Sequence, residues 1–95
     1  PFSALDFQTK LKLEDLVSTT LKTFKKTAIL VTHDIGEAIA MSDRVIVLGK
    51  NPGRIKKEIC IPEHIRQAIP FDAREADGFY ELVRNIWKEL EDDGR

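Results

Sequence analysis

Residues 27–48, TAILVTHDIGEAIAMSDRVIVL, contain two short apolar runs separated by a helical pattern. The first run, residues 27–32, is almost continuously apolar, which is typical of a strand covered on both faces in a parallel sheet. The second run, residues 44–48, predicts another strand, and residues 35–41 between them predict a short helix. A strand, a helix and a second strand in this order indicate an α/β fold.

The short helix carries its own start signal. Asp34 precedes it and Glu37 stands three positions later, which is the spacing of a capping box, where each side chain bonds the backbone N–H of the other residue. Ile35, Ala38 and Ile39 then form the expected buried face. The helix is therefore expected to begin directly after the first strand.

The second strand leads into a β-hairpin. A type II turn is predicted at Pro52 and Gly53 in the segment KNPG, residues 50–53, because proline fits the second position of such a turn and glycine can supply a positive φ at the third. Residues 54–61 then form a return strand. Their mixture of charged and apolar side chains suits an exposed edge.

The chain before this unit predicts an amphipathic helix over residues 7–25. Its apolar positions recur three and four residues apart, so we expect them to be buried in a core. Asp6 stands where a side chain can cap the first turn, and Lys25 and Lys26 stand near the end, where positive charge meets the negative pole of the helix dipole. The apolar positions are Leu13, Leu16, Val17, Leu21 and Phe24.

The chain after the hairpin predicts a connecting segment and a second amphipathic helix. Residues 62–72 have weak periodicity and contain Pro62 and Pro70, so they are expected to connect the hairpin to the helix. Asp72 and Glu75 have capping-box spacing and are expected to begin that helix. Its apolar positions are Phe79, Leu82, Val83, Ile86, Trp87 and Leu90.

Composition excludes several classes of protein. The 95 residues, of which 42% are hydrophobic and 33% are charged, suit one globular domain at most. The net charge of −1 argues against a nucleic-acid partner, which usually selects a strongly basic face. No apolar run approaches the roughly 18–20 residues of a membrane span. A single cysteine, Cys60, excludes an internal disulfide.

His33 is the residue best placed for chemistry. It follows the first predicted strand directly, and ligands of open α/β sheets bind outside the carboxyl ends of strands. An imidazole there can donate to an anion or relay a proton, although it could also simply bond a loop carbonyl. His64 is interpreted as a surface residue. The sequence contains no glycine-rich phosphate loop and no metal-ligand spacing, so no metal site is predicted.

Three motifs stand out along the chain: PFSALD at residues 1–6, VTHD at residues 31–34 and SDRVIVL at residues 42–48. Their order resembles that in the C-terminal part of the ATP-binding subunit of an ABC transporter. The resemblance implies a partial P-loop NTPase-type (ABC ATPase) domain with a helix, a strand, a short helix, a β-hairpin and a long C-terminal helix. It assigns residues 1–61 to the nucleotide-binding domain and residues 62–95 to a linker and a C-terminal amphipathic helix.

The same resemblance implies two functional segments. In this family the D-loop crosses to the opposite subunit and couples two ATP sites, and the histidine of the H-loop contacts the γ-phosphate. Ser3, Ala4, Leu5 and Asp6 match the D-loop, and His33 matches the histidine. A hydrogen-bond donor aimed at the charge that develops during phosphoryl transfer is a strong catalytic device, so His33 is expected to be catalytic.

The segment NPGRI, residues 51–55, and the closing helix resemble the importer subgroup that handles nitrate, sulfonate, taurine or bicarbonate. The resemblance implies ATP and Mg²⁺ as ligands of the whole subunit. It implies a second ATP-binding subunit, a membrane permease and a solute-binding protein as partners. It also implies a cytoplasmic protein that is peripheral on the inner face of the cell membrane.

The phosphate loop, Q-loop, signature motif and catalytic glutamate of the family would all precede Pro1. We therefore expect these 95 residues alone to be inactive and to need no cofactor. The predicted strand at residues 27–32 would then expose an apolar edge, which predicts self-association. Two alternatives stay open. One is a self-standing, oligomerising interaction or regulatory module derived from the same half of the domain, and the other is a small hydrolase that uses His33 with Asp6 or Asp34 as an acid/base pair.

Overall fold

Helices pack against one face of a single β-hairpin in the part of the chain that the structure describes. The computed structural model describes residues 3–49 and 53–93, with the backbone alone for residues 3–6, 92 and 93. The predicted α/β class is confirmed at this level. In chain order the elements are α1 (Ser3–Thr23), α2 (Ile35–Met41), β1 (Arg44–Leu48), β2 (Ile55–Cys60), α3 (Glu63–Arg66), α4 (Pro70–Ala73) and α5 (Phe79–Asp93).

Strands β1 and β2 form the predicted antiparallel hairpin. Val45 lies opposite Ile59, and β2 is one residue shorter at each end than the predicted strand at residues 54–61. The predicted turn falls mostly on residues 50–52, which lie outside the described residues. Gly53 has a φ of 86°, the positive value that was expected of it.

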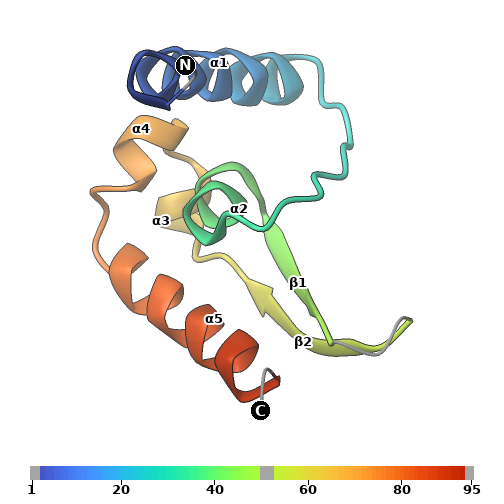
Figure 1. Cartoon of the computed structure of the whole chain (residues 1–95). Helices are drawn as coiled ribbons and strands as arrows, with labels where there is room; N and C mark the ends of the chain where they lie inside the picture. Colours follow the sequence, from blue (N-terminus) through green and yellow to red (C-terminus); the bar gives the residue numbers. More distant parts are fainter. Residues whose placement is uncertain (1–2, 50–52, 94–95) are drawn as a thin grey trace.

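The hydrophobic core lies on one face of the hairpin. Val45 and Val47 are buried, whereas the alternating Ile46 and Leu48 are 44% and 62% exposed on the other face. Figure 1 shows α2 and α5 on the same side of the hairpin. Apolar side chains of both helices belong to the same buried cluster as the two valines. The core comprises Ile39, Ala40, Val45, Val47, Ile61, Ile65, Ala73, Phe79 and Ile86.

Helix α2 begins where its capping signal predicts. The Asp34 Oδ1 atom accepts the backbone N–H of Glu37 at 3.0 Å. The return half of the capping box is replaced, because the backbone N–H of Asp34 donates to the hydroxyl oxygen of Thr32 at 3.0 Å. The predicted face of the helix turns toward the core, with Ile39 only 1% exposed.

The predicted connecting segment at residues 62–72 is wrong in part, because it contains the two short helices α3 and α4. Pro62 occupies the N-cap position of α3, and Pro70 is the first residue of α4. A proline fits the start of a helix, since the first N–H groups have no partner inside the helix and φ is already suitable. The two prolines therefore begin helices here, and both helices contribute to the core through Ile65 and Ala73.

Helix α5 is the predicted C-terminal amphipathic helix, but its predicted cap is wrong. Asp72 lies inside α4, where its carbonyl oxygen accepts the backbone N–H of Glu75 at 3.0 Å. α5 begins later, at Phe79, which is buried together with Ile86. Trp87 lies on the same predicted apolar face but is 58% exposed, so the helix buries only part of that face.

Helix α1, Ser3–Thr23, begins and ends earlier than predicted. Asp6 lies inside the helix and does not cap it, because the serine, alanine and leucine before it are compatible with helical backbone. The helix ends in a Schellman motif, in which the backbone N–H of Lys26 donates to the carbonyl of Leu21 at 2.9 Å. Lys25 adopts the left-handed conformation that this motif needs, with a φ of 51°.

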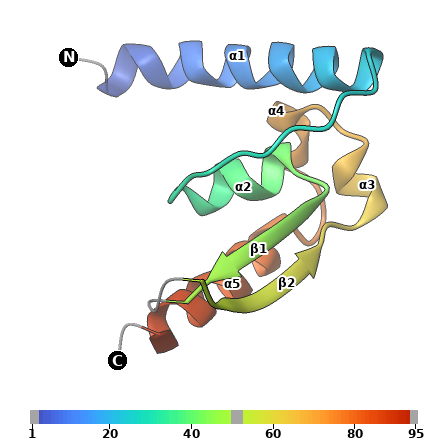
Figure 2. The ribbon, with the colours of Figure 1, turned by 90° about the vertical axis from the view of Figure 1, so that its right-hand side faces the viewer.

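The apolar stripe of α1 faces away from the core. Leu16, Val17 and Phe24 are 62%, 43% and 66% exposed, so the prediction that they are buried is wrong for the described residues. The opposite face is the one that docks, since Glu14 and Ser18 are 4% and 6% exposed. Figure 2 shows α1 lying across α2 and α4, on the side away from the hairpin. Periodicity identifies an apolar face but does not say what covers it.

The predicted strand at residues 27–32 is also wrong within the described residues. The segment crosses from α1 to α2 without regular secondary structure, as Figures 1 and 2 show. Ile29 and Val31 are 91% and 88% exposed. A strand needs a neighbouring strand to receive its backbone hydrogen bonds, and the described hairpin lies elsewhere.

A pair of identical substitutions tests this division between core and uncovered surface. Ile39→Val in the 95-residue chain should lower the free energy of unfolding by about 1 kcal/mol, because it removes a buried methyl group. Ile29→Val should change it by less than about 0.5 kcal/mol, because the side chain is solvated. Urea denaturation measures both values. Equal losses for the two variants would contradict the described position of residues 27–32.

Candidate functional site

His33 lies in the bend between the uncovered segment and α2. Its position follows from the start of α2, because both of its chain neighbours, Thr32 and Asp34, take part in capping that helix. The imidazole is exposed and has no hydrogen-bond partner among residues 3–49 and 53–93. The interpretation of His33 as a histidine that bonds a loop carbonyl therefore finds no such bond in this part of the chain.

Ser3, Ala4, Leu5 and Asp6 form the first turn of α1, and the structure describes their backbone alone. Figure 2 shows that the first turns of α1 and the start of α2 lie at the same end of the molecule. The D-loop candidate, residues 3–6, and the loop that carries His33 therefore lie at the same end of the molecule. No contact between them is described.

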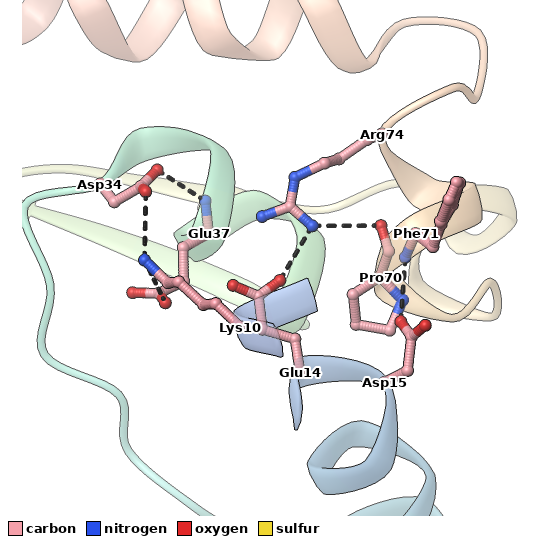
Figure 3. A network of polar contacts seen from close by, with 8 residues as sticks. All are labelled: Lys10, Glu14, Asp15, Asp34, Glu37, Pro70, Phe71 and Arg74. Atoms are coloured by element: carbon pink, nitrogen blue, oxygen red, sulfur yellow. Dashed lines mark hydrogen bonds and ion pairs between the residues drawn. The ribbon is translucent and has the colours of Figure 1, made fainter. Parts of the chain in front are cut away.

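Lys10 joins these two parts of the molecule. It lies one turn after Asp6 on α1, and its Nζ atom is 3.2 Å from Glu37 Oε2 and 3.5 Å from Asp34 Oδ2. Figure 3 shows the lysine reaching from α1 to both carboxylates. Glu37 is the better covered of the two partners, with its side chain 13% exposed against 49% for Asp34.

The charges of this cluster stabilise one another. The Thr32 hydroxyl, followed by Lys10, holds the pKa of the Glu37 carboxyl below its ordinary value. The backbone N–H of Glu37, followed by Lys10, lowers the pKa of Asp34. The hydrogen bond from Lys10 to Glu37 raises the pKa of the lysine. The cluster is therefore most stable with both carboxylates and the ammonium charged.

Two further contacts dock α1 onto α4. Arg74 donates from Nη1 to Glu14 Oε1 at 2.8 Å, and the Phe71 backbone N–H donates to Asp15 Oδ1 at 3.0 Å. Both are drawn in Figure 3. The Glu14 carboxylate is almost fully buried, and its second oxygen has no hydrogen-bond partner among the described residues. A buried carboxylate needs its counterion, so Arg74 fixes how α1 sits on the core.

Lys22 holds the other end of α1. Its Nζ atom donates to the backbone carbonyl of Arg66 at 2.7 Å. Sequence analysis missed this polar attachment, although a signal was available: Lys10, Glu14, Ser18 and Lys22 recur at intervals of four and so share one face of a helix. The apolar stripe on the opposite face concealed that pattern.

The remaining candidates add no second centre. His64 is exposed, as predicted, and its Nε2 atom lies 2.8 Å from the carbonyl oxygen of Asp77. Cys60 is an exposed free thiol in β2. Asp34, one of the two acid partners proposed for His33 in a hydrolase, uses its carboxylate for the cap of α2 and for Lys10. The side chain of Asp6, the other proposed partner, lies outside the described structure.

Residues 3–49 and 53–93 hold no group of three or more histidine, cysteine, aspartate or glutamate side chains arranged to bind a metal ion. No described helix is both long enough and apolar enough to cross a membrane. A hollow of about 300 Å³ lies near the C-terminal half of α1, away from His33. It is lined by Lys22, Asp43, Glu63, Arg66 and Gln67.

Known proteins resemble almost the whole chain. It is 58% identical over 90 residues, 95% of its length, to the uncharacterized ABC transporter ATP-binding protein YtlC of Bacillus subtilis, of which it covers 35%. It is 38% identical over 80 residues to the aliphatic sulfonates import ATP-binding protein SsuB 1 of Pseudomonas aeruginosa, covering 84% of the chain and 30% of that protein. It is 43% identical over 75 residues to the aliphatic sulfonates import ATP-binding protein SsuB 2 of Burkholderia lata, and this match covers 79% of the chain and 26% of that protein.

All three of these relatives are ATP-binding proteins of transporters. The chain belongs to the family of ABC transporter ATP-binding proteins, as its motifs indicated. It spans about a third of the length of the curated relatives that it matches. No protein-family model matches the chain, and no solved structure does.

Acid should weaken the cluster around His33. The pKa values of Asp34 and Glu37 lie below their ordinary 3.8 and 4.5, so these carboxylates stabilise the fold above those pH values, and this contribution is lost as the pH falls through the lower folded-state values. Glu37→Gln should therefore make the free energy of unfolding fall less steeply on acidification below pH 4.5.

Urea denaturation of the 95-residue chain at a series of pH values measures this slope. Glu75→Gln is a matched control, since Glu75 is exposed and lies outside the cluster. An unchanged slope for Glu37→Gln would contradict the assignment of the cluster as a pH-dependent source of stability.

Proposed function

We propose that this chain is the C-terminal part of the ATP-hydrolysing subunit of an ABC importer. In this proposal, residues 1–61 complete a nucleotide-binding domain of P-loop NTPase type, and residues 62–95 form a linker and a C-terminal helix. Ser3, Ala4, Leu5 and Asp6 are the D-loop, and His33 is the histidine that meets the γ-phosphate. The observation that carries the proposal is the 58% identity to an ABC transporter ATP-binding protein over 95% of the chain.

The setting of His33 supports a catalytic role. The imidazole is exposed at the end of residues 27–32 and is not used in a hydrogen bond to other described residues, so it is available to a ligand. In the proposed whole domain, residues 27–32 would be a strand, and ligands of open α/β sheets bind at the ends of strands. A neutral or protonated imidazole can donate a hydrogen bond to a phosphate oxygen as negative charge develops there.

The uncovered apolar surface supports the proposal that more of the domain packs here. Residues 27–32 present Ile29 and Val31 to solvent, and the outward face of α1 presents Leu16 and Phe24. Several large apolar side chains left exposed on neighbouring elements are typical of a surface that another part of a protein covers. In the proposed whole domain, residues 27–32 pair as a strand within a larger sheet and the apolar stripe of α1 packs against that sheet.

The ligands and partners of the whole subunit follow from the same proposal. The sequence lacks a glycine-rich phosphate loop, so ATP and Mg²⁺ would be held chiefly by other parts of the subunit while His33 supplies one donor. The partners would be a second ATP-binding subunit, a membrane permease and a solute-binding protein, with the subunit peripheral on the cytoplasmic face of the membrane. Two of the relatives are named for the import of aliphatic sulfonates, which favours a small oxyanion as the solute.

A second candidate is a self-standing, oligomerising interaction module. The exposed residues 27–32 favour it, because an uncovered extended segment can pair with the same segment of another copy. The reading frame upstream of Pro1 distinguishes the two: an in-frame phosphate loop and signature motif favour the ATPase, and a start codon next to Pro1 favours the module. Light scattering that finds only monomers at tens of micromolar would exclude the module.

The ATPase activity of the full-length subunit tests the proposed function. His33→Ala should lower kcat for Mg-ATP at least about 100-fold, because it removes a donor to the transition state. His64→Ala is a matched control, since His64 is also an exposed histidine but bonds a carbonyl in the C-terminal region, and it should retain activity. The 95-residue chain alone should show no magnesium-dependent ATPase activity.

Three results would contradict the proposal. One is a full-length subunit without ATPase activity, another is full activity after His33→Ala, and the third is activity of the 95-residue chain that is lost with His33→Ala. The third result would favour the small-hydrolase alternative.

A further inference from the structure

A lysine on α1 contacts Asp34, which follows His33, and Glu37 in the first turn of α2. Lys10 Nζ lies 3.2 Å from Glu37 and 3.5 Å from Asp34, the residue that directly follows His33. We propose that Lys10 is a positioning residue for His33, which holds the histidine loop in register with the helix that begins at the D-loop. This inference rests on the proposed function, because it takes His33 as the histidine that meets the γ-phosphate.

Lys10 contacts Asp34 and Glu37 and not His33 itself, so its effect on His33 must pass through the hydrogen bonds around the histidine. The hydroxyl oxygen of Thr32 accepts the backbone N–H of Asp34 at 3.0 Å. The same hydroxyl helps to lower the pKa of the Glu37 carboxyl. Asp34 in turn accepts the backbone N–H of Glu37 at 3.0 Å. Both chain neighbours of His33 are therefore tied to the first turn of α2, so the histidine backbone moves with that turn.

Lys10 links this unit to the start of α1. The next contacts along the helix, from Glu14 and Asp15, go to α4 and not to the His33 loop. A shift of α1 relative to α2 must therefore break the Lys10 contacts or carry the His33 loop along. Since Ser3, Ala4, Leu5 and Asp6 occupy the first turn of the same helix, Lys10 connects the D-loop helix to the histidine.

Charge adds a second reason for a cation at this position. Asp34 and Glu37 place two carboxylates beside the residue that is proposed to approach a triphosphate. Lys10 compensates both of them. Without it, two uncompensated negative charges would repel the γ-phosphate and could draw the imidazole toward themselves.

The same geometry separates a positioning role from a structural one. Lys10 and Asp34 are each about half exposed, and ion pairs of this kind contribute little to stability. A displacement of a catalytic group by about 1 Å, in contrast, can lower a rate by up to about 100-fold. Loss of Lys10 should therefore reduce kcat far more than it reduces stability.

The test uses the full-length subunit that contains this chain, with kcat and KM measured for Mg-ATP. Lys10→Met should lower kcat about 10- to 100-fold with KM changed by less than about threefold, because the interaction acts on the reacting geometry. Lys10→Arg should restore most of kcat. Lys22→Met is a matched control: Lys22 also attaches α1 to the core, but it bonds the carbonyl of Arg66 away from His33, so kcat should stay near the wild-type value.

A charge exchange keeps the test decisive if Lys10→Met fails to fold. Lys10→Glu should abolish most of the activity, because the new carboxylate repels Asp34 and Glu37. Adding Glu37→Lys to this variant should raise kcat at least about tenfold, because it restores an ion pair. Wild-type kcat in Lys10→Met, equal losses in Lys10→Met and Lys22→Met, or no recovery in the exchanged pair would each overturn the role of Lys10. Failure of the proposed function is distinct, because it appears as full activity in His33→Ala.

Discussion

The attachment of α1 to the rest of the chain through charged side chains determines which surfaces the molecule presents. Lys10 binds Glu37, and Arg74 binds the buried carboxylate of Glu14. Because the polar face of α1 is the docked face, its apolar stripe with Leu16 and Phe24 must point outward. A buried carboxylate is costly without its counterion, so this orientation depends on Arg74 staying in place. The uncovered surface is thus a consequence of the docking and not of a poorly formed helix.

The elements whose signals are local could be predicted from the sequence. Asp34 and Glu37 predict the start of α2, the apolar run at residues 44–48 with its turn signal predicts the hairpin, and the apolar repeat predicts α5. Long-range partners could not be predicted in this way. Residues 27–32 have the composition of a buried strand but lie uncovered, because pairing needs a neighbour that the pattern does not specify. Pro62 contributes to the prediction of a connecting segment, although a proline also suits the start of a helix, as it does in α3.

The candidate site shows the same division. His33 and the segment Ser3, Ala4, Leu5 and Asp6 were identified from the order of motifs, and their proposed roles come from the resemblance to ABC ATP-binding subunits. Lys10 was missed, because a lysine on the exposed-looking side of an amphipathic helix is ordinarily interpreted as solvated. Only its position opposite Asp34 and Glu37 in space gives it a possible role. An i, i+4 series of polar residues on a helix therefore merits consideration as a docking face.

We propose that residues 27–32 join the sheet of a larger ATP-binding domain, with His33 at the end of that strand. Amide hydrogen exchange, measured by mass spectrometry on the full-length subunit and on the 95-residue chain, tests this proposal. Amides of residues 27–32 should exchange slowly in the full-length subunit and rapidly in the isolated chain, while α2 is protected in both. Rapid exchange of residues 27–32 in both proteins would contradict the proposal.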